Sequence, residues 1–319
     1  MDVIDIKGDG AASLMPLLTN WSLSDSEGMQ SDRLSLTFSG MESQTLIPKS
    51  GAEWRVFIDG EKRGVYQISS ISEYLHPVRL VVQLTTAIFC VADEKGFKEP
   101  RRRTFPPARI QDVVKAVMEP HGYEVRVSPK FAYKPTEHLN QNEETDSAFI
   151  ARLAAKHDAI AKPIDRMYVF GQSGSLKTLS GNEKPVVTIT PQDVQQGSAK
   201  LAHPSFVRFN GVKAHWQTPD TGLSDTQVIG SKPYFSIKNV FKHPGEAQVA
   251  AEAKLAEFKR KIQKFSATLR GKPGLFAESV MILQGFQSPR AKGHWSVDSV
   301  TLSGTRTSYT IQVEATRPI

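Results

Sequence analysis

Alternation of apolar and polar residues is the feature that most constrains what this chain can fold into. A period of two places every second side chain on one face, which is typical of a half-buried strand. The clearest alternating segments are residues 34–38, 54–58, 78–84 and 309–316. Because short strands need closure or a second layer to bury one face, the predicted fold class is α+β, mainly β, with two barrel-like β domains, small α/β inserts and one long amphipathic helix.

The breaks between alternating segments divide the chain into three predicted regions. Residues 1–95 are expected to form an N-terminal β-barrel domain, in which Asp59-Gly60 is a hairpin signal. Residues 96–171 are expected to form an α/β insert that opens with loop-forming residues. Residues 172–319 are expected to form a second β-rich, barrel-like body that ends in a hairpin over 295–316. No short-period repeat is present in the sequence.

Three helices are predicted from their apolar stripes, and the first is a short one with Ile110, Val113, Val114 and Val117 on one face. The second covers residues 145–157, with Thr145 or Asp146 as its N-cap and Phe149 among its buried residues. The longest helix is expected over residues 245–265, and much of its remaining surface is basic. Its predicted apolar face comprises Leu255, Phe258, Ile262 and Phe265.

Charge and cysteine usage restrict the function classes. The net charge of +7 fits either a polyanionic neighbour or an ordinary basic soluble protein. The one cysteine, Cys90, cannot form an intramolecular disulfide and is interpreted as a small buried hydrophobe. The acidic N-terminus does not resemble a signal peptide, and no apolar segment approaches the roughly 18 residues that a membrane span needs. The chain is therefore expected to fold in a reducing cytoplasm, without a membrane anchor.

Motifs that carry enzymatic chemistry are not found. The eight histidines are not spaced as zinc ligands on one helix face, and no Gly-x-Ser-x-Gly turn occurs. Gly171-Gln172-Ser173-Gly174 lacks the other elements of a phosphate-binding loop and is interpreted as a turn. His157 is expected at a helix end, where it would suit the helix dipole. The sequence therefore predicts no catalytic, cofactor-binding or metal-binding residues.

Two charged clusters remain as candidates for function. Glu143, Glu144 and Asp146 precede a predicted helix, so helix capping is favoured over glycoside cleavage by a carboxylate pair. The basic triplet at 101–103 allows two interpretations. It could contact a phosphate backbone or an acidic partner, or it could be a solvated loop between domains.

The order of the elements resembles a known family. Residues 139–154 contain an acidic lead followed by the helix pattern Asp-x-x-Phe-apolar-x-Arg-Leu, and a strand is expected at 167–170. The long basic helix, the Gly-Lys-Pro-Gly-Leu sequence at 271–275 and the hairpin at 295–316 follow. This arrangement resembles the late control gene D proteins of contractile-tailed temperate phages. That family includes the hub part of the type VI secretion protein VgrG and the hubs of R-type bacteriocins.

The resemblance implies an architectural role rather than an enzymatic one. A hub of this kind is expected to be a homotrimer, a threefold ring that adapts a hexameric tail tube protein to a trimeric tail spike protein. A tape measure protein or DNA would occupy the channel. The implied location is the baseplate of a virion tail or bacteriocin particle, assembled in the bacterial cytoplasm. Because the chain ends at Ile319, directly after the hairpin, the spike is expected to be another polypeptide.

Two other functions are alternatives to the hub. One is a cell-wall hydrolase domain of a tail, which would need a cleft with carboxylates of perturbed pKa. The other is a free nucleic-acid-binding barrel protein, for which aromatic and basic residues interleaved on strands would be evidence. Residues 206–209, Phe-Val-Arg-Phe, are the best example of such interleaving in the sequence.

Overall fold

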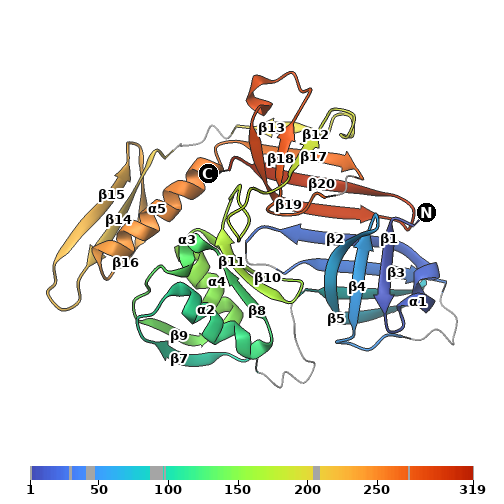
Figure 1. Ribbon diagram of the computed structural model, residues 1–319, viewed down its shortest axis with the longest axis horizontal. Coiled ribbons are helices and arrows are strands. Elements are labelled where there is room, and N and C mark those ends of the chain that lie inside the picture. The colour runs from blue at the N-terminus through green and yellow to red at the C-terminus, as the bar shows by residue number, and fades with distance from the viewer. Residues whose placement is uncertain are drawn as a thin grey trace.

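The computed structural model describes residues 2–28, 31–40, 47–86, 96, 98–203, 209–271 and 274–318. Cys90 and most of the 206–209 segment lie outside these residues, so the interpretations placed on them are not addressed. Strands make up most of the regular structure, as the alternating pattern predicted. Figure 1 shows the chain as a long curved sheet with two smaller α/β units attached to it.

Within the described residues, the main body is a 12-stranded sheet. Its central path runs β1-β4-β5-β6-β3-β2-β19-β20-β17-β13, and β18 connects β12 to β19. The strands on the path are β1 (Ile4–Gly8), β4 (Glu53–Ile58), β5 (Glu61–Leu75), β6 (Val78–Thr85), β3 (Arg33–Ser39), β2 (Leu18–Ser26), β19 (His294–Gly304), β20 (Tyr309–Thr316), β17 (Lys264–Arg270) and β13 (Lys200–Ala202). The remaining two are β12 (Val186–Ile189) and β18 (Val280–Leu283).

The N-terminal half of this sheet curls toward closure. The short helices α1 (Ala11–Leu14) and η1 (Met15–Leu17) follow β1. The turn between β19 and β20 meets the far end of the curl, where the backbone N–H of Val3 donates to the Arg306 carbonyl over 2.8 Å. The Trp21 indole N–H donates to the Thr305 carbonyl over 2.8 Å. The C-terminal hairpin, predicted over 295–316, is confirmed by β19 and β20 and helps to close the N-terminal curl.

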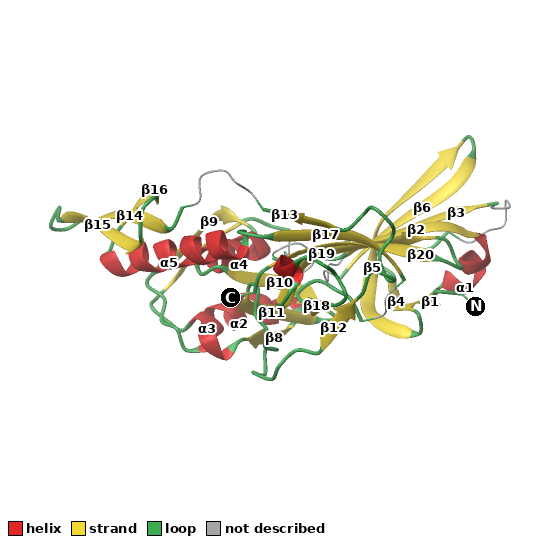
Figure 2. Cartoon of the chain, turned by 90° about the horizontal axis from the view of Figure 1, so that it is seen from above, coloured by secondary structure: helices red, strands yellow, loops and turns green. Residues whose placement is uncertain are grey.

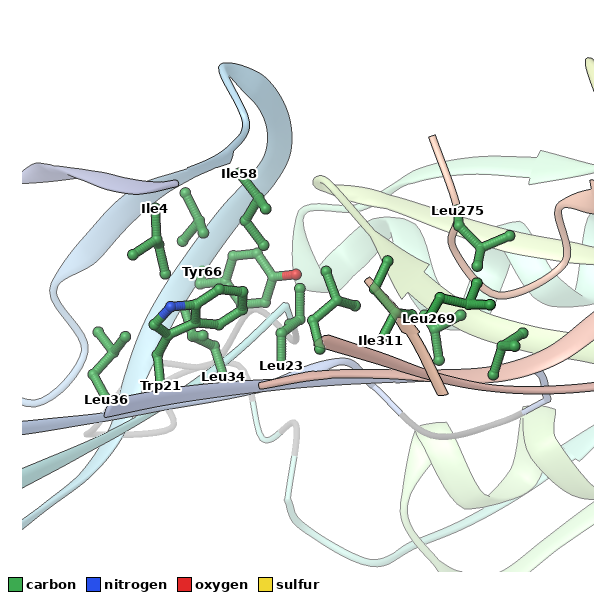
Figure 3. Close-up of a cluster of buried hydrophobic side chains, with 14 of the residues drawn as sticks. Ile4, Trp21, Leu23, Leu34, Leu36, Ile58, Tyr66, Leu269, Leu275 and Ile311 are labelled. Atoms are coloured by element: carbon green, nitrogen blue, oxygen red, sulfur yellow. The ribbon is translucent and has the colours of Figure 1, made fainter. Parts of the chain in front are cut away.

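The N-terminal and C-terminal strands share one sheet and one core. β2 pairs antiparallel with β19, from Trp21 opposite Gly304 to Ser26 opposite Ser299. Figure 3 shows buried side chains from both ends of the chain in one cluster, among them Ile4, Trp21, Leu23, Leu269 and Ile311. The sequence pattern indicated the strands on either side but not this continuity between the first and last predicted regions.

The insert has its own core between helices and a small sheet. The sheet has the order β10 (Ala159–Ile164), β11 (Met167–Gln172), β8 (Glu124–Val127), and the helices are α2 (Ile110–Met118), α3 (Pro129–Ala132) and α4 (Asp146–Lys156), with the 3-10 turn η2 (Glu119–His121). The predicted helix over 145–157 is confirmed by α4. Thr145 Oγ1 accepts a hydrogen bond from the Ala148 N–H over 3.2 Å, which is N-capping geometry. Phe149 is buried, as predicted.

The basic triplet at 101–103 is not a loop, as its sequence had suggested, but strand β7 (Arg101–Phe105). β7 pairs antiparallel with β9 (Leu139–Glu144), which the sequence had marked only as a polar lead before the helix. The prediction was wrong because the carboxylates that offset the three guanidinium charges lie about 40 residues further along the chain.

A second small unit lies at the other end of the molecule from the curl (Figure 2). β14 (Gly211–Gln217) lies between β15 (Ser224–Gly230) and β16 (Tyr234–Phe241), and α5 (Pro244–Arg260) packs on this sheet. The helix predicted over 245–265 therefore ends early, at Arg260. Phe265 belongs to β17, where it pairs with Ala315 of β20 and packs on Trp295 with ring centroids 6.0 Å apart. Its helical spacing from Leu255 was coincidental, since the long-range pairing with β20 selects the extended conformation.

Candidate functional site

Lys162 on β10 is enclosed where three parts of the chain meet. Its side chain is 2% exposed. The ammonium lies 3.0 Å from Asp25 of β2, 3.0 Å from Glu278 before β18 and 3.7 Å from Asp32 before β3. It also donates to the Ser26 carbonyl over 2.9 Å. This group, the Lys162 cluster, joins the insert to strands from both ends of the sequence.

The Lys162 cluster contains more acidic than basic groups, since one ammonium faces three carboxyl groups. Burial, with repulsion from Asp25, raises the pKa of Asp32 to about 8. Burial likewise raises the pKa of Glu278. Burial alone would lower the pKa of Lys162, but attraction to the surrounding carboxylates outweighs it and the pKa is raised. Near neutral pH, Asp32 therefore retains its proton while Lys162 remains charged.

The surroundings of the Lys162 cluster resemble a structural junction more than a reaction centre. An adjoining cavity of about 190 Å³ is lined by cluster residues and by apolar side chains such as Leu23, Phe276 and Val300. Asp25 also accepts the Ala277 backbone N–H over 2.9 Å, so both of its oxygens bind partners from elsewhere in the chain. Contacts of this kind favour one relative orientation of the joined parts, because any other orientation leaves a buried charge without a partner.

A second buried charge lies at the start of α4. Asp146 has no exposed surface, and its carboxylate accepts hydrogen bonds from Gln141 over 2.8 Å, from His121 over 2.7 Å and from Arg103. The Arg101 guanidinium lies 3.6 Å away. We call these residues the Asp146 cluster. All of them lie within the insert, on β7, η2, β9 and α4.

The structure brings the two charged clusters of the sequence together. Besides the contacts to Asp146, Arg102 pairs with Glu143 over 3.2 Å at an exposed position. Glu144 pairs instead with Arg152 of α4 over 2.6 Å. The predicted basic patch thus faces the predicted acidic cluster across β7 and β9. The two clusters therefore form ion pairs with each other inside the insert.

His157 follows α4, as predicted, but its charge state differs from the one expected. Burial, with the nearby Lys134 and Lys156, lowers its pKa to about 4. The imidazole is therefore neutral near pH 7 and does not contribute a charge to the helix dipole. The next residue, Asp158, binds Arg260 at the end of α5, with a 2.6 Å hydrogen bond from one guanidinium nitrogen. This pair connects the insert to the second small unit.

Sequence reasoning missed Lys162 altogether. A single charged residue within the apolar segment Ala159–Ile164 was the available signal, because a buried lysine requires carboxylate partners. Nothing local indicated which carboxylates those were. They lie 137, 130 and 116 positions away in the sequence, counted from residues 25, 32 and 278 to residue 162.

Across the ranges that the structure describes, no three His, Cys, Asp or Glu side chains gather as a metal-binding group would. In the same residues, none of the helices combines the length and the apolar character needed to cross a bilayer.

Comparison with known proteins finds similarity to phage tail components. No model of a known protein family matches it. The chain is 21% identical to the probable baseplate hub protein of Escherichia phage P2, over 98% of this chain and 91% of the phage protein. In structure it is similar to the 43 kDa tail protein of prophage MuSo2 from Shewanella oneidensis, with a TM-score of 0.71, 15% identity and coverage of 99% and 98% of the two chains.

A secretion-system protein has a related fold. The E. coli c3393 protein, a component of the type VI secretion system, superposes with a TM-score of 0.58 and 11% identity, over 99% of this chain and 77% of that protein. The resemblance to tail hub proteins that the sequence suggested is therefore confirmed, and the fold is one found in phage tail proteins.

Proposed function

We propose that this protein is the structural baseplate hub of a contractile phage-type tail, a homotrimer that joins a hexameric tail tube to a trimeric spike. The observation that carries the proposal is the extent of the similarity. Likeness to a probable baseplate hub protein runs through nearly the whole of both chains rather than through one shared module. The role is architectural, its site of action is the tail, and no catalytic step is assigned to it.

The internal construction supports an architectural role. A hub that transmits load between a tube and a spike must keep its parts in one fixed arrangement. Here β2 and β19 join the two ends of the chain in one sheet, and the Lys162 cluster fixes the insert against it. The Asp158–Arg260 pair then connects the insert to α5. Each link lies between parts that are far apart in the sequence.

The native mass of the purified chain tests the proposal. Light scattering coupled to gel filtration should give three times the chain mass of 35.3 kDa for the chain alone, or three chains plus the bound spike when a spike protein is added. The tube protein should then bind this trimer on the face opposite the spike. A chain that stays monomeric with both partners present would overturn the proposal.

A further inference from the structure

Helices cover only one face of the insert's sheet, and the other face carries apolar residues beside Glu124, Arg126 and Lys162. Ala161, Tyr168 and Phe170 point toward α2 and α4 and belong to the core of the insert. Alternate residues on the opposite face, Ile160, Ile164, Met167 and Val169, line a groove of about 470 Å³. The far wall is the irregular loop 173–185, which contributes Leu179, together with Phe276.

The rim of this groove is basic. Lys130 and Lys177 line it at exposed positions, and Lys184, which lines it too, donates to the Glu278 carbonyl over 2.6 Å. Glu278 also borders it, but the carboxylate of Glu278 is engaged by Lys162. An apolar floor with a cationic rim fits an apolar protein segment that carries a carboxylate beside its hydrophobic side chains.

The hairpin of β5 and β6 presents such a segment. Among the large hydrophobic side chains in the described part of the chain, Leu75 has the greatest exposed fraction, 84%, and Val78 opposite it is 57% exposed. Glu73 pairs with Leu80, so Glu73 lies on the same face as Leu75 and Val78. Leu80 is fully buried in the barrel core. The side of the hairpin that faces the core therefore extends past the core, and Leu75 and Val78 are exposed there.

The opposite side of the hairpin tip is held by a local contact. The Arg79 guanidinium stacks on the Tyr74 ring at 3.9 Å from its centroid. Figure 2 shows the hairpin projecting from one end of the long sheet, away from β8, β10 and β11, which lie on the other side of that sheet. The tip therefore points away from the groove of its own chain, and both surfaces are available to a second copy.

We propose that the β5–β6 hairpin tip of one copy inserts Leu75 and Val78 into the groove of the next copy, with Glu73 facing the lysines of the rim. This inference rests on the proposed homotrimer and names the contact that builds it. The tip and the groove are different surfaces, so the contact is heterologous. Three such contacts close into a ring if the rotation between copies is one third of a turn.

Substitutions on the hairpin test this contact through the assembly state. Leu75→Asp places a charge where the groove is apolar and should raise the apparent dissociation constant of the trimer roughly 30-fold or more, the scale of an interface hot spot. Leu223→Asp is the matched control, because Leu223 is also largely exposed, at 64%, but lies in the turn between β14 and β15. Both variants alter exposed side chains, so both should keep the wild-type circular dichroism spectrum.

A charge exchange gives a test that general destabilisation cannot imitate. Glu73→Lys and Lys177→Glu should each weaken the trimer, and the double variant should recover most of the loss. Full trimerisation of Leu75→Asp, or no recovery in the double variant, would overturn the inference while leaving the hub proposal intact. A wild-type chain that trimerises only when the spike is present would also overturn the inference and leave the hub proposal intact. A chain that remains monomeric even with spike and tube would overturn both.

Discussion

Lys162 and Asp146 are both fully enclosed charges in the insert, yet their partners come from different parts of the chain. The donors around Asp146 all lie within residues 101–146 and hold β7, β9 and α4 together. The carboxylates around Lys162 come from β2, from the segment before β3 and from the loop before β18. A buried charge leaves few relative arrangements open to the groups that neutralise it. The Asp146 cluster therefore specifies the internal structure of the insert, whereas the Lys162 cluster specifies where the insert lies on the main sheet.

The largest loss of stability that we expect from a single substitution comes from Lys162→Met, which removes the charge but keeps the length of the side chain. Asp25, Asp32 and Glu278 would then face one another without a cation, so the free energy of unfolding should fall by about 3–5 kcal/mol. Urea denaturation measures the loss. Lys62→Met is the control, because Lys62 pairs with Asp165 at the surface and should lose less than about 1 kcal/mol. Equal losses in the two variants would show that the Lys162 cluster does not join the parts as inferred.

A smaller effect is expected for Asp146→Asn, which keeps the shape of the side chain. Arg103 and Arg101 would lose their shared carboxylate, at a cost of about 2–3 kcal/mol. Because the partners of Asp146 all lie within the insert, the loss of stability should be confined to the insert. Hydrogen exchange should therefore accelerate in α4 and β7 but not at the β2–β19 junction. Glu143→Gln, at an exposed carboxylate, serves as the control. Faster exchange at the β2–β19 junction would show that the Asp146 cluster also stabilises structure outside the insert.

The contrast between the clusters also shows which features can be predicted from the sequence alone. Alternation located β3, β4, β6 and β20 because a side-chain period of two is a local property of a half-buried strand. The apolar stripe of α4 and its cap at Thr145 were equally local signals. Both groups of predictions needed only neighbouring residues, and the structure confirmed them.

Features that depend on distant partners were not predictable in the same way. The extended conformation of Phe265 follows from its pairing with Ala315, and β7 follows from carboxylates near residue 146. β15 carries little alternation in its sequence, Ser-Asp-Thr-Gln-Val-Ile-Gly, although α5 covers only one face of its sheet. Asp146 stood out as acidic, but its burial depends on Arg103 and His121, which precede it by 43 and 25 residues.

The Lys162 cluster should also make stability depend on pH. The pKa of Asp32 is raised from 3.8 to about 8 in the folded protein, so between these values the folded state holds a proton that the unfolded state releases. The free energy of unfolding should therefore fall as the pH rises from about 4 to 8, by at most ~1.4 kcal/mol per pH unit from this group. Lys162 adds no slope in this window because it stays charged in both states.

Asp32→Asn isolates that contribution. The variant should match wild type near pH 4 and be the more stable of the two at pH 8, which thermal unfolding across this range would measure. Glu278 also has a raised pKa and will leave a residual slope in the same direction. A wild-type slope that survives unchanged in Asp32→Asn would mean that another group carries the buried proton.

The smallest effect concerns the helix whose first residue is Asp146. Thr145→Ala removes the hydroxyl that accepts the Ala148 N–H and should cost about 1 kcal/mol. Thr145→Ser keeps an equivalent oxygen and should recover most of that loss. Because the cap is exposed whereas Asp146 is buried, the two variants separate helix capping from charge burial at adjacent positions. If Thr145→Ala destabilised the protein as much as Asp146→Asn, the buried carboxylate would contribute little beyond ordinary capping. The Asp146 cluster would then not be comparable to the Lys162 cluster as a stabilising buried charge.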